Sequence, residues 1–340
     1  MNRHGFICAG CWTVDRIKIT NCWPEQEALA HIMTVDRHGG GSAHNSGIDL
    51  KKLNPNLPVS TVGVIGTDAD GDFLFNQALT YGIDTVGLHR TVQCDTSYTD
   101  VITVSQTGKR TFFHYTGTND LLTPEHFSFT DSSAKILHLG LLSVHAGMDK
   151  AISKDSNGWS EVLRKAQQSG LETSIEMVSV EAERNRELAF PCLPWLDYLV
   201  VNDMEIGALG NLPTVIAGQT DIAACIKAAE NVLDKGAMQL VTVHYPMGAI
   251  CVTRDRQVHN RASYDIPQSL VAGTVGAGDA FASGFLYGMH ENQSIGESLT
   301  IGHAVAAASL RSPNTVDAVE SLAACKAFAQ GFAKREQPEN

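Results

Sequence analysis

A single carboxylate lies where a glycine-rich turn meets an apolar helical pattern. The stretch GTVGAGDAFASGFLYG covers residues 273–288, and Asp279 is its only charged residue. The main-chain amides of Gly276, Ala277 and Gly278 can point toward one position, and a helix beginning near Asp279 adds the positive end of its dipole. The pattern therefore predicts an anion site with a carboxylate beside it.

The carboxylate of Asp279 cannot serve to bind the anion, because two negative charges repel each other. It can accept the proton of a nucleophilic hydroxyl while the amides stabilise the charge on a transferred group. It can also cap the amino end of its own helix. The cap is the better explanation of an isolated Gly-x-Gly-Asp, so the choice depends on what else the sequence contains.

A second glycine-rich segment, HGGGSAHNSG, covers residues 38–47. Its glycines, Gly40 and Gly41 among them, allow a ligand to approach the backbone closely, and Asn45 supplies both a donor and an acceptor. Such a segment suits the hydroxyl groups of a small molecule. A flexible loop before a helix capped by Ser42 also explains the glycines, but it gives Asn45 no task.

Two common nucleotide motifs are absent from the sequence. The chain contains no G-x-x-x-x-G-K-[ST] loop and no early G-x-G-x-x-G after its first strand. The second absence weakens the hypothesis of a nicotinamide-dependent dehydrogenase, although the order of elements described below fits one.

Composition limits the class of protein. The 340 residues carry a formal net charge of −12, and 43% of them are hydrophobic. This charge argues against binding along a nucleic-acid backbone, and no apolar run approaches membrane-spanning length. The eight cysteines are scattered as free buried thiols would be, and the Cys8-x-x-Cys11 pair has no partner ligands in metal-site spacing. We expect a cytoplasmic protein that binds neither nucleic acid nor membrane.

Apolar strands alternate with helical patterns along the chain. The expected strands cover residues 5–10, 59–66, 134–140, 171–177, 196–202 and 238–244, the expected helices cover 70–82, 159–169, 181–190 and 220–235, and the chain is mostly helical from 277 onward. This order predicts an α/β fold in which helices flank both faces of a doubly wound, mostly parallel sheet.

One region departs from this order. Residues 96–115 alternate with period two around a QTGK turn, and residues 16–20 form a short strand of similar character. We interpret them as a small β-sheet that closes over a substrate, rather than as an edge hairpin of the main sheet.

The motifs together resemble those of the ribokinase-like (PfkB) carbohydrate kinases. AGTVGAGDAFASGF resembles the family's carboxyl-terminal signature, GGGSAHNSG its amino-terminal glycine signature, and VNDMEIGAL its N-x-x-E element. VGVIGTDADGDF and TGTNDLLTPEHF resemble two further segments, and the matches follow the family order from about residue 5 to 320. The resemblance implies one ribokinase-like domain over residues 1–340 with a lid formed by about 12–36 and 92–118.

The resemblance also implies roles for individual residues. Asp279 is then the catalytic base, and the amides of residues 276–278 form the anion hole. The remaining roles fall on two groups: Asp15, Gly40, Gly41 and Asn45 contact the sugar, while Asn202, Thr242 and His303 contact ATP, with Asn202 and Glu205 holding Mg²⁺. Without the resemblance, the sequence predicts that Asn202 and Glu205 form a capping box and that His303 is a buried core histidine.

Three positions depart from the family pattern. Gly273 stands where a cation-binding Asp is usual, which argues against activation by a monovalent cation. His244 replaces the glycine of a T-x-G element, and Glu176 stands at the Asp of a D-x-N-x-R element. None of these changes removes the base, the anion hole or the magnesium element.

We therefore predict a phosphotransferase that uses ATP and Mg²⁺ to phosphorylate a hydroxyl of a sugar or sugar-like molecule. A nucleoside kinase of the same family is an alternative, with Trp12, Trp23, Phe113 and Tyr115 as candidates for the wall against the base. A ligand-binding regulator without turnover is a second alternative. Because VITV and FFHY cannot both be buried under so small a sheet, we expect a homodimer formed through the lid.

Overall fold

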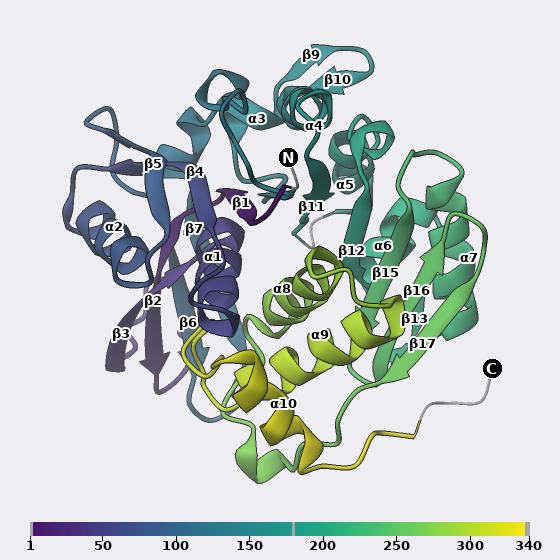
Figure 1. The fold of residues 1–340 in the computed structure, drawn as a ribbon. Coiled ribbons are helices and arrows are strands. Elements are labelled where there is room, and N and C mark those ends of the chain that lie inside the picture. Colours follow the sequence, from purple (N-terminus) through teal and green to yellow (C-terminus); the bar gives the residue numbers. More distant parts are fainter. Residues whose placement is uncertain (1–2, 179–180, 337–340) are drawn as a thin grey trace.

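The computed structural model describes residues 3–178 and 181–336 and is built on a nine-stranded sheet (Figure 1). The strand order is β17-β16-β15-β12-β11-β8-β1-β4-β5, parallel from β5 to β15, while β16 and β17 are antiparallel. The strands are β1 Phe6–Gly10, β4 Val59–Gly66, β5 Asp84–Thr91, β8 Ile136–Gly140, β11 Glu172–Ile175, β12 Tyr198–Asn202, β15 Leu240–Tyr245, β16 Gly248–Thr253 and β17 Val258–Ala262.

Helices cover both faces of this sheet (Figure 1). One face carries α1 Ser42–Leu53, α2 Ala69–Thr80, α8 Ala277–His290, α9 Ile295–Ser309 and α10 Leu322–Gln330. The other carries α3 Ala146–Asp149, α4 Gly158–Gln168, α5 Ala182–Ala189, α6 Asp203–Gly210 and α7 Ile222–Leu233. None of the helices within these described residues is long and apolar enough to cross a membrane.

Alternation along the strands divides the core into two layers. Ile7 and Val201 pack against the layer that contains Trp159 of α4, whereas Cys8 and Val200 pack against the layer that contains Phe285 of α8. Both faces are therefore apolar, and the strands read as continuous hydrophobic runs, as expected for a parallel sheet between helices.

A separate four-stranded sheet lies beside the main one, with the order β3-β2-β6-β7 (Figure 1). Its strands are β2 Thr13–Thr20, β3 Ile32–Gly40, β6 Tyr98–Val104 and β7 Arg110–Tyr115. The expected hairpin is confirmed as β6 and β7, and the expected strand at 16–20 lies within β2. We refer to these four strands as the second sheet.

The predicted fold class and the six predicted strands are confirmed, but several elements were missed. The sequence did not predict β3, β5, β16 and β17. Strands β3, β5 and β17 are edge strands that mix polar and apolar residues without a clean pattern, whereas β16 is buried but pairs antiparallel with β15 after a tight turn, outside the alternation of strands and helices. Two short hairpins were also missed: β9 Ala151–Ser153 with β10 Ser156–Asn157, and β13 Val215–Ile216 with β14 Gln219–Thr220.

Candidate active site

Two helix amino ends meet above the carboxyl ends of the central strands. Asn45 lies in the first turn of α1 and Asp279 in the first turn of α8, and Asn45 Nδ2 donates a hydrogen bond of 2.7 Å to Asp279 Oδ2. The two glycine-rich segments of the sequence therefore form one site. This is the position where open α/β sheets bind ligands.

The turn before α1 has space only for glycine. Gly41 is the N-cap with φ 91°, and a Cβ atom there would lie 2.5 Å from the carbonyl oxygen of Cys11. A Cβ atom on Gly40 would lie 2.4 Å from Asp15 Oδ2. Ser42 makes no capping hydrogen bond, so the alternative of a helix capped by Ser42 is wrong. The close packing places Asp15 beside the start of α1.

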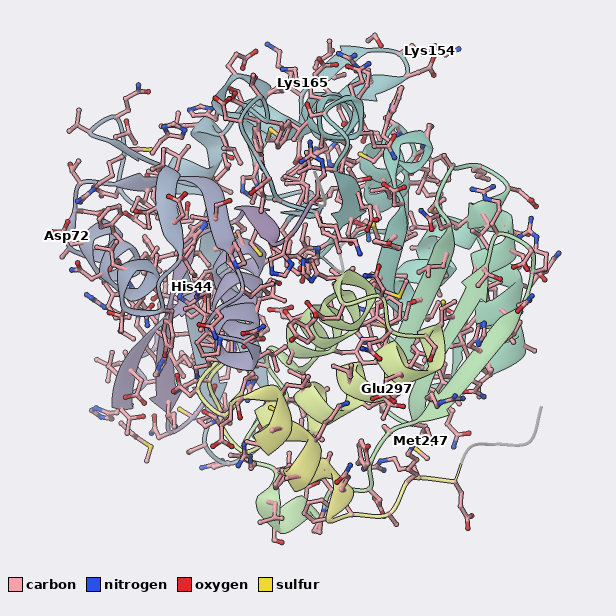
Figure 2. The ribbon with its side chains drawn as sticks, in the orientation of Figure 1. His44, Asp72, Lys154, Lys165, Met247 and Glu297 are labelled. Carbon is pink, nitrogen blue, oxygen red and sulfur yellow. The ribbon has the colours of Figure 1, made fainter. Side chains whose placement is uncertain are left out.

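Asn45 has a fixed orientation. Its Oδ1 accepts a hydrogen bond of 3.1 Å from Thr315 Oγ1 and lies 2.9 Å from His44 Nδ1. His44, labelled in Figure 2, is fully buried on α1. Because Oδ1 faces Thr315 and His44, the amide nitrogen Nδ2 of Asn45 is directed at Asp279.

Burial raises the pKa of two of the predicted carboxyl groups. The pKa of Asp15 rises to about 6 because of desolvation, although a hydrogen bond from Thr99 opposes the shift. The pKa of Asp279 rises to about 8, first through desolvation and then through the charge of Glu176 and a hydrogen bond with it. Both groups hold protons more tightly than exposed carboxyl groups do.

Glu176 and His138 belong to this site although neither was proposed as a site residue. Glu176 follows β11, and its Oε2 lies 2.9 Å from Nε2 of His138 on β8. Desolvation lowers the pKa of His138 to about 4 and raises that of Glu176 to about 7. One sequence signal pointed to Glu176, because this residue departs from the family pattern. The polar His138 inside the apolar strand ILHLG was a weaker one.

The amino end of α8 presents the first-turn amides that an anion site needs. Gly276 is the N-cap with φ 78°, and a Cβ atom on it would lie 2.8 Å from the backbone of Thr315. The first amides of a helix have no acceptor within that helix. The amide of Ala277 lies 3.3 Å from the carbonyl oxygen of Thr274, which is a long contact. These features fit the predicted anion hole.

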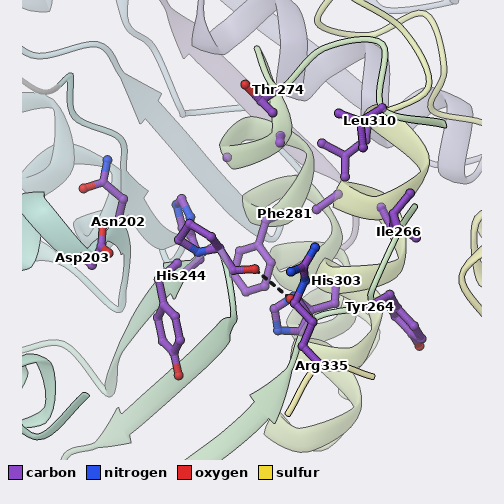
Figure 3. A pocket seen from close by; sticks show the side chains of 18 of the residues that line it. Asn202, Asp203, His244, Tyr264, Ile266, Thr274, Phe281, His303, Leu310 and Arg335 are labelled. Carbon is purple, nitrogen blue, oxygen red and sulfur yellow. Dashed lines mark hydrogen bonds between the residues drawn. The ribbon is translucent and has the colours of Figure 1, made fainter. Parts of the chain in front are cut away.

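A cavity of about 420 Å³ opens beside this turn (Figure 3). Its wall near the turn includes Asn202 and Gly278, and its far wall includes the apolar Ile266 and Leu310. The ring of Phe281 lies between those of His244 and His303, with centroids 5.2 and 5.0 Å away. The cavity thus has a polar end at the helix start and an apolar end beyond it.

The residues expected to contact ATP divide into two groups. Asn202 and His303 line the cavity, and His303 Nε2 also lies 3.1 Å from the carbonyl oxygen of Arg261. Thr242 is fully buried within β15 and does not line the cavity. The structure therefore does not bring Thr242 together with the other two.

Asn202 and Glu205 form a capping box at the start of α6. Asn202 Oδ1 accepts from the amide of Glu205 at 2.8 Å, and Glu205 Oε2 accepts from the amide of Asn202 at 3.0 Å. The capping box that the sequence predicts without the family resemblance is therefore present. It fixes both side chains at the carboxyl end of β12.

Two departures from the family pattern have a local explanation. A Cβ atom on Gly273 would lie 2.7 Å from Cα of Pro313, so an aspartate does not fit at this position without movement. His244 fills the space beside Gly278, where a Cβ atom would lie 3.2 Å from its Cε1.

A further carboxyl group lies inside α1, one turn after Asn45. Asp49 is fully buried, and neither of its carboxyl oxygens has a hydrogen-bond partner within residues 3–178 and 181–336. Desolvation raises its pKa well above the ordinary value, and the charge of Asp279 adds to the shift. The folded chain therefore keeps Asp49 protonated over a wide pH range.

Comparison with known proteins identifies the family. Residues 8–322 match the family described as pfkB family carbohydrate kinase. A deoxyribokinase of Salmonella typhi is 26% identical over 276 residues, which cover 81% of this chain and 82% of that protein. An adenosine kinase of Schizosaccharomyces pombe is 25% identical over 79% of this chain and 78% of its own length.

The fold has close structural counterparts. The structure of Arabidopsis thaliana ribokinase complexed with ribose and ATP superposes with a TM-score of 0.79, covering 96% of this chain and 99% of that one at 18% identity. At this identity the likeness concerns the fold alone.

Asp49 gives a prediction for stability. Replacing Asp49 with Asn removes a proton that the folded state keeps and the unfolded state releases above about pH 4. Between that pH and the raised pKa of Asp49, the wild type should lose about 1.4 kcal/mol of unfolding free energy per pH unit from this group. The advantage of Asp49→Asn should therefore grow with pH, as denaturant unfolding at several pH values can show.

The matched control is Asp36→Asn, because Asp36 is an exposed residue of the second sheet. It should leave the pH dependence of stability unchanged. An Asp49→Asn curve parallel to the wild-type curve would contradict the expectation that this carboxyl group stays protonated.

Proposed function

The chain belongs to the pfkB family of carbohydrate kinases, and from this premise we propose that it transfers the γ-phosphoryl group of ATP to a hydroxyl of a sugar or sugar-like acceptor. The observation that supports this most directly is the hydrogen bond between Asn45 and Asp279. It joins a hydroxyl-binding segment to a carboxylate beside an anion site, which are the two halves that phosphoryl transfer needs.

The acceptor would lie between the second sheet and the start of α1. Asp15 can accept from one of its hydroxyls, Asn45 can donate to another through the second hydrogen of Nδ2, and Gly40 and Gly41 permit close approach of the backbone. These contacts would hold the reacting hydroxyl next to Asp279. Positioning of this kind accounts for much of the rate in phosphoryl transfer.

In the transfer step, Asp279 would take the proton as the acceptor oxygen forms its bond to the γ-phosphorus. The bond between that phosphorus and the bridging oxygen breaks, and ADP leaves with the electron pair. The amides of Gly276, Ala277 and Gly278 would stabilise the negative charge on the transferring group, helped by the dipole of α8. The products are a phosphate ester, ADP and a protonated Asp279.

The donor set of Asn202 and Glu205 fits Mg²⁺. Both offer oxygen ligands at the start of α6, where Asn202 lines the cavity, and Mg²⁺ prefers such ligands together with water and substrate phosphates. When bound, the ion supplies positive charge that neutralises the phosphates of the nucleotide. The capping box keeps the two side chains in place for this task.

The cavity of Figure 3 would hold the nucleotide. Its apolar wall with Ile266 and Leu310 suits a purine base, and its polar end lies next to the anion site. His303 would contribute an aromatic surface of this wall. Thr242 would act indirectly, because it lies within the sheet beneath.

A nucleoside kinase remains the alternative, since an adenosine kinase is among the relatives. Of the aromatic residues considered for the wall against a base, Trp12 is fully buried and donates through Nε1 to Thr61. Trp23 and Phe113 stack on each other with centroids 6.2 Å apart and are exposed. The register of the second sheet places Phe113 and Tyr115 on the face opposite Asp15, so neither forms a wall on the side of the acceptor, which favours a sugar-like acceptor.

An assay of ADP release over a panel of sugars, polyols and nucleosides tests the proposal. We expect turnover with at least one sugar-like acceptor and weaker turnover with nucleosides. Turnover with nucleosides alone would favour the alternative, and a protein that binds ligands without releasing ADP would be a regulator instead.

The base can be tested by Asp279→Asn. The catalytic rate should fall by roughly two to four powers of ten, the usual contribution of general acid–base catalysis, while ATP binding stays within a few-fold of the wild type. Asp234→Asn is the control, because Asp234 is an exposed residue that pairs with Arg256 on the surface. Near wild-type turnover in a folded Asp279→Asn protein would rule out this role.

We further propose that the chain is a single kinase domain whose lid, formed by about residues 12–36 and 92–118, pairs with the lid of a second copy. The register of the second sheet places Asp15 and Thr99 on one face, and Val35 and Phe113 on the other. Val35 is 63% exposed and Phe113 is 54% exposed. A two-fold partner would cover these two exposed apolar side chains, which lie beside the ion pair of Lys18 and Asp100 on the same face.

Charges on this face should separate the copies. Val35→Asp combined with Phe113→Asp should shift the protein from dimer toward monomer in light scattering at micromolar concentration. Gln106→Asp, in the exposed turn between β6 and β7, should leave the mass unchanged. A wild-type protein that stays monomeric with both substrates bound would contradict the shared lid.

A further inference from the structure

We propose that Glu176 is a positioning residue for Asp279, and that the two carboxyl groups share one proton while His138 holds Glu176 in place. The proposal rests on the proposed kinase function for its role in turnover. The pairing itself is a property of the free protein and can be measured without any substrate.

The hydrogen bonds of Asp279 and Glu176 show that a proton must lie between their carboxyl groups. Asn45 Nδ2 donates to Asp279 Oδ2 at 2.7 Å, and His138 Nε2 lies 2.9 Å from Glu176 Oε2. The two carboxyl groups are themselves in hydrogen-bonding contact. A carboxylate has no hydrogen to donate, so this central contact requires a proton on one of the two groups.

Burial makes the shared proton the stable arrangement. The side chain of Glu176 is 13% exposed and that of His138 is 2% exposed. Two negative charges in contact in such a place repel strongly, as they do in carboxylate pairs that ionise in two separate steps. His138 stays neutral, because burial lowers its pKa to about 4, so it acts as a hydrogen-bond donor and does not supply a positive charge.

The other titratable groups around the pair do not relieve this repulsion. The buried thiols of Cys8 and Cys11 respond to the charge of Glu176, and they stay uncharged because burial raises their pKa. The other groups that interact with the pair from neighbouring elements are Asp15 of β2, Asp49 of α1, Glu205 of α6 and His244 of β15. Three are carboxyl groups, and burial lowers the pKa of His244 to about 4, so it is neutral near pH 7.

The pair gives the base a defined state before transfer. In the free protein the shared proton lies on Asp279, because its pKa of about 8 exceeds the pKa of Glu176, about 7. When the proton moves to Glu176, Asp279 is ionised, faces the acceptor hydroxyl and accepts hydrogen bonds from Asn45 and from Glu176. After transfer the pair holds two protons and must release one before the next turnover. Activity should therefore fall as the pH drops through about 7, where the pair becomes doubly protonated.

Glu176→Gln tests the pairing with little change of shape. The Gln amide can donate to Asp279, and its oxygen can accept from His138, so the variant should fold. A neutral donor in place of a charged carboxyl group should lower the pKa of Asp279. The acid limb of the kcat/KM profile should then move down by about one pH unit or more, and the plateau of kcat should fall about tenfold with an unchanged KM for ATP.

Two further variants separate positioning from a structural role. Glu176→Asp keeps the carboxyl group and should restore much of the wild-type pH profile. Glu172→Gln makes the same substitution at the start of β11, four residues earlier, where the carboxylate accepts a hydrogen bond of 2.8 Å from the hydroxyl of Tyr198. It should leave the profile unchanged. An acid limb that Glu176→Gln does not move would overturn the proposal.

A measurement on the free protein needs no turnover. The folded pair keeps protons up to about pH 7 to 8, whereas the unfolded chain releases them near pH 4, so wild-type stability falls as the pH rises through this window. Glu176→Gln should flatten this fall, as denaturant unfolding between about pH 5 and 8.5 can show. Parallel curves for the two proteins would overturn the pairing.

The two readouts distinguish the failure of this inference from the failure of the proposed function. If no acceptor in the panel is phosphorylated but Glu176→Gln flattens the stability curve, the pairing holds and the kinase function fails. If turnover is found but neither the pH profile nor the stability curve responds to Glu176→Gln, the kinase function holds and the pairing fails.

Discussion

The hydrogen bond from Asn45 to Asp279 joins residues 234 positions apart, and the rest of the candidate site depends on it. It can form only because the amino ends of α1 and α8 meet over the carboxyl ends of the same parallel strands. Each helix start is a glycine turn, since a side chain on Gly41 or Gly276 would collide with neighbouring backbone. Close packing thus brings the two polar segments into a single site.

Burial of this site determines its electrostatics. Asp15, Glu176 and Asp279 all have raised pKa values, with desolvation as the first cause in each case. Such carboxyl groups reduce stability at neutral pH, because the unfolded chain releases their protons more readily than the folded chain does. A base that holds its proton near the working pH is also the one that general-base catalysis favours. Burial is therefore the cause both of the lower stability at neutral pH and of the raised pKa values that suit a general base.

The cavity beside α8 shows how neighbouring positions compensate for one another. Gly273 leaves room for Pro313, and His244 packs against Gly278 and the ring of Phe281. These departures alter the surroundings of the anion site but leave its amides and its carboxylate in place. The helix start at Gly276 is therefore kept although the sequence departs from the family pattern nearby, and Figure 3 shows His244 beside Phe281.

The sequence by itself determined the fold class, the buried strands and the two polar segments, because hydrophobic periodicity and glycine turns are local properties. It also identified Asp279, Asn45 and Asp15 as neighbours through family motifs. Only the tertiary structure joined Glu176 and His138 to Asp279, since they come from the end of β11, from β8 and from α8, and their contact depends on the order of strands in the sheet. The same holds for Thr242, whose burial in β15 no local pattern could reveal, because burial depends on the helices packed against the strand.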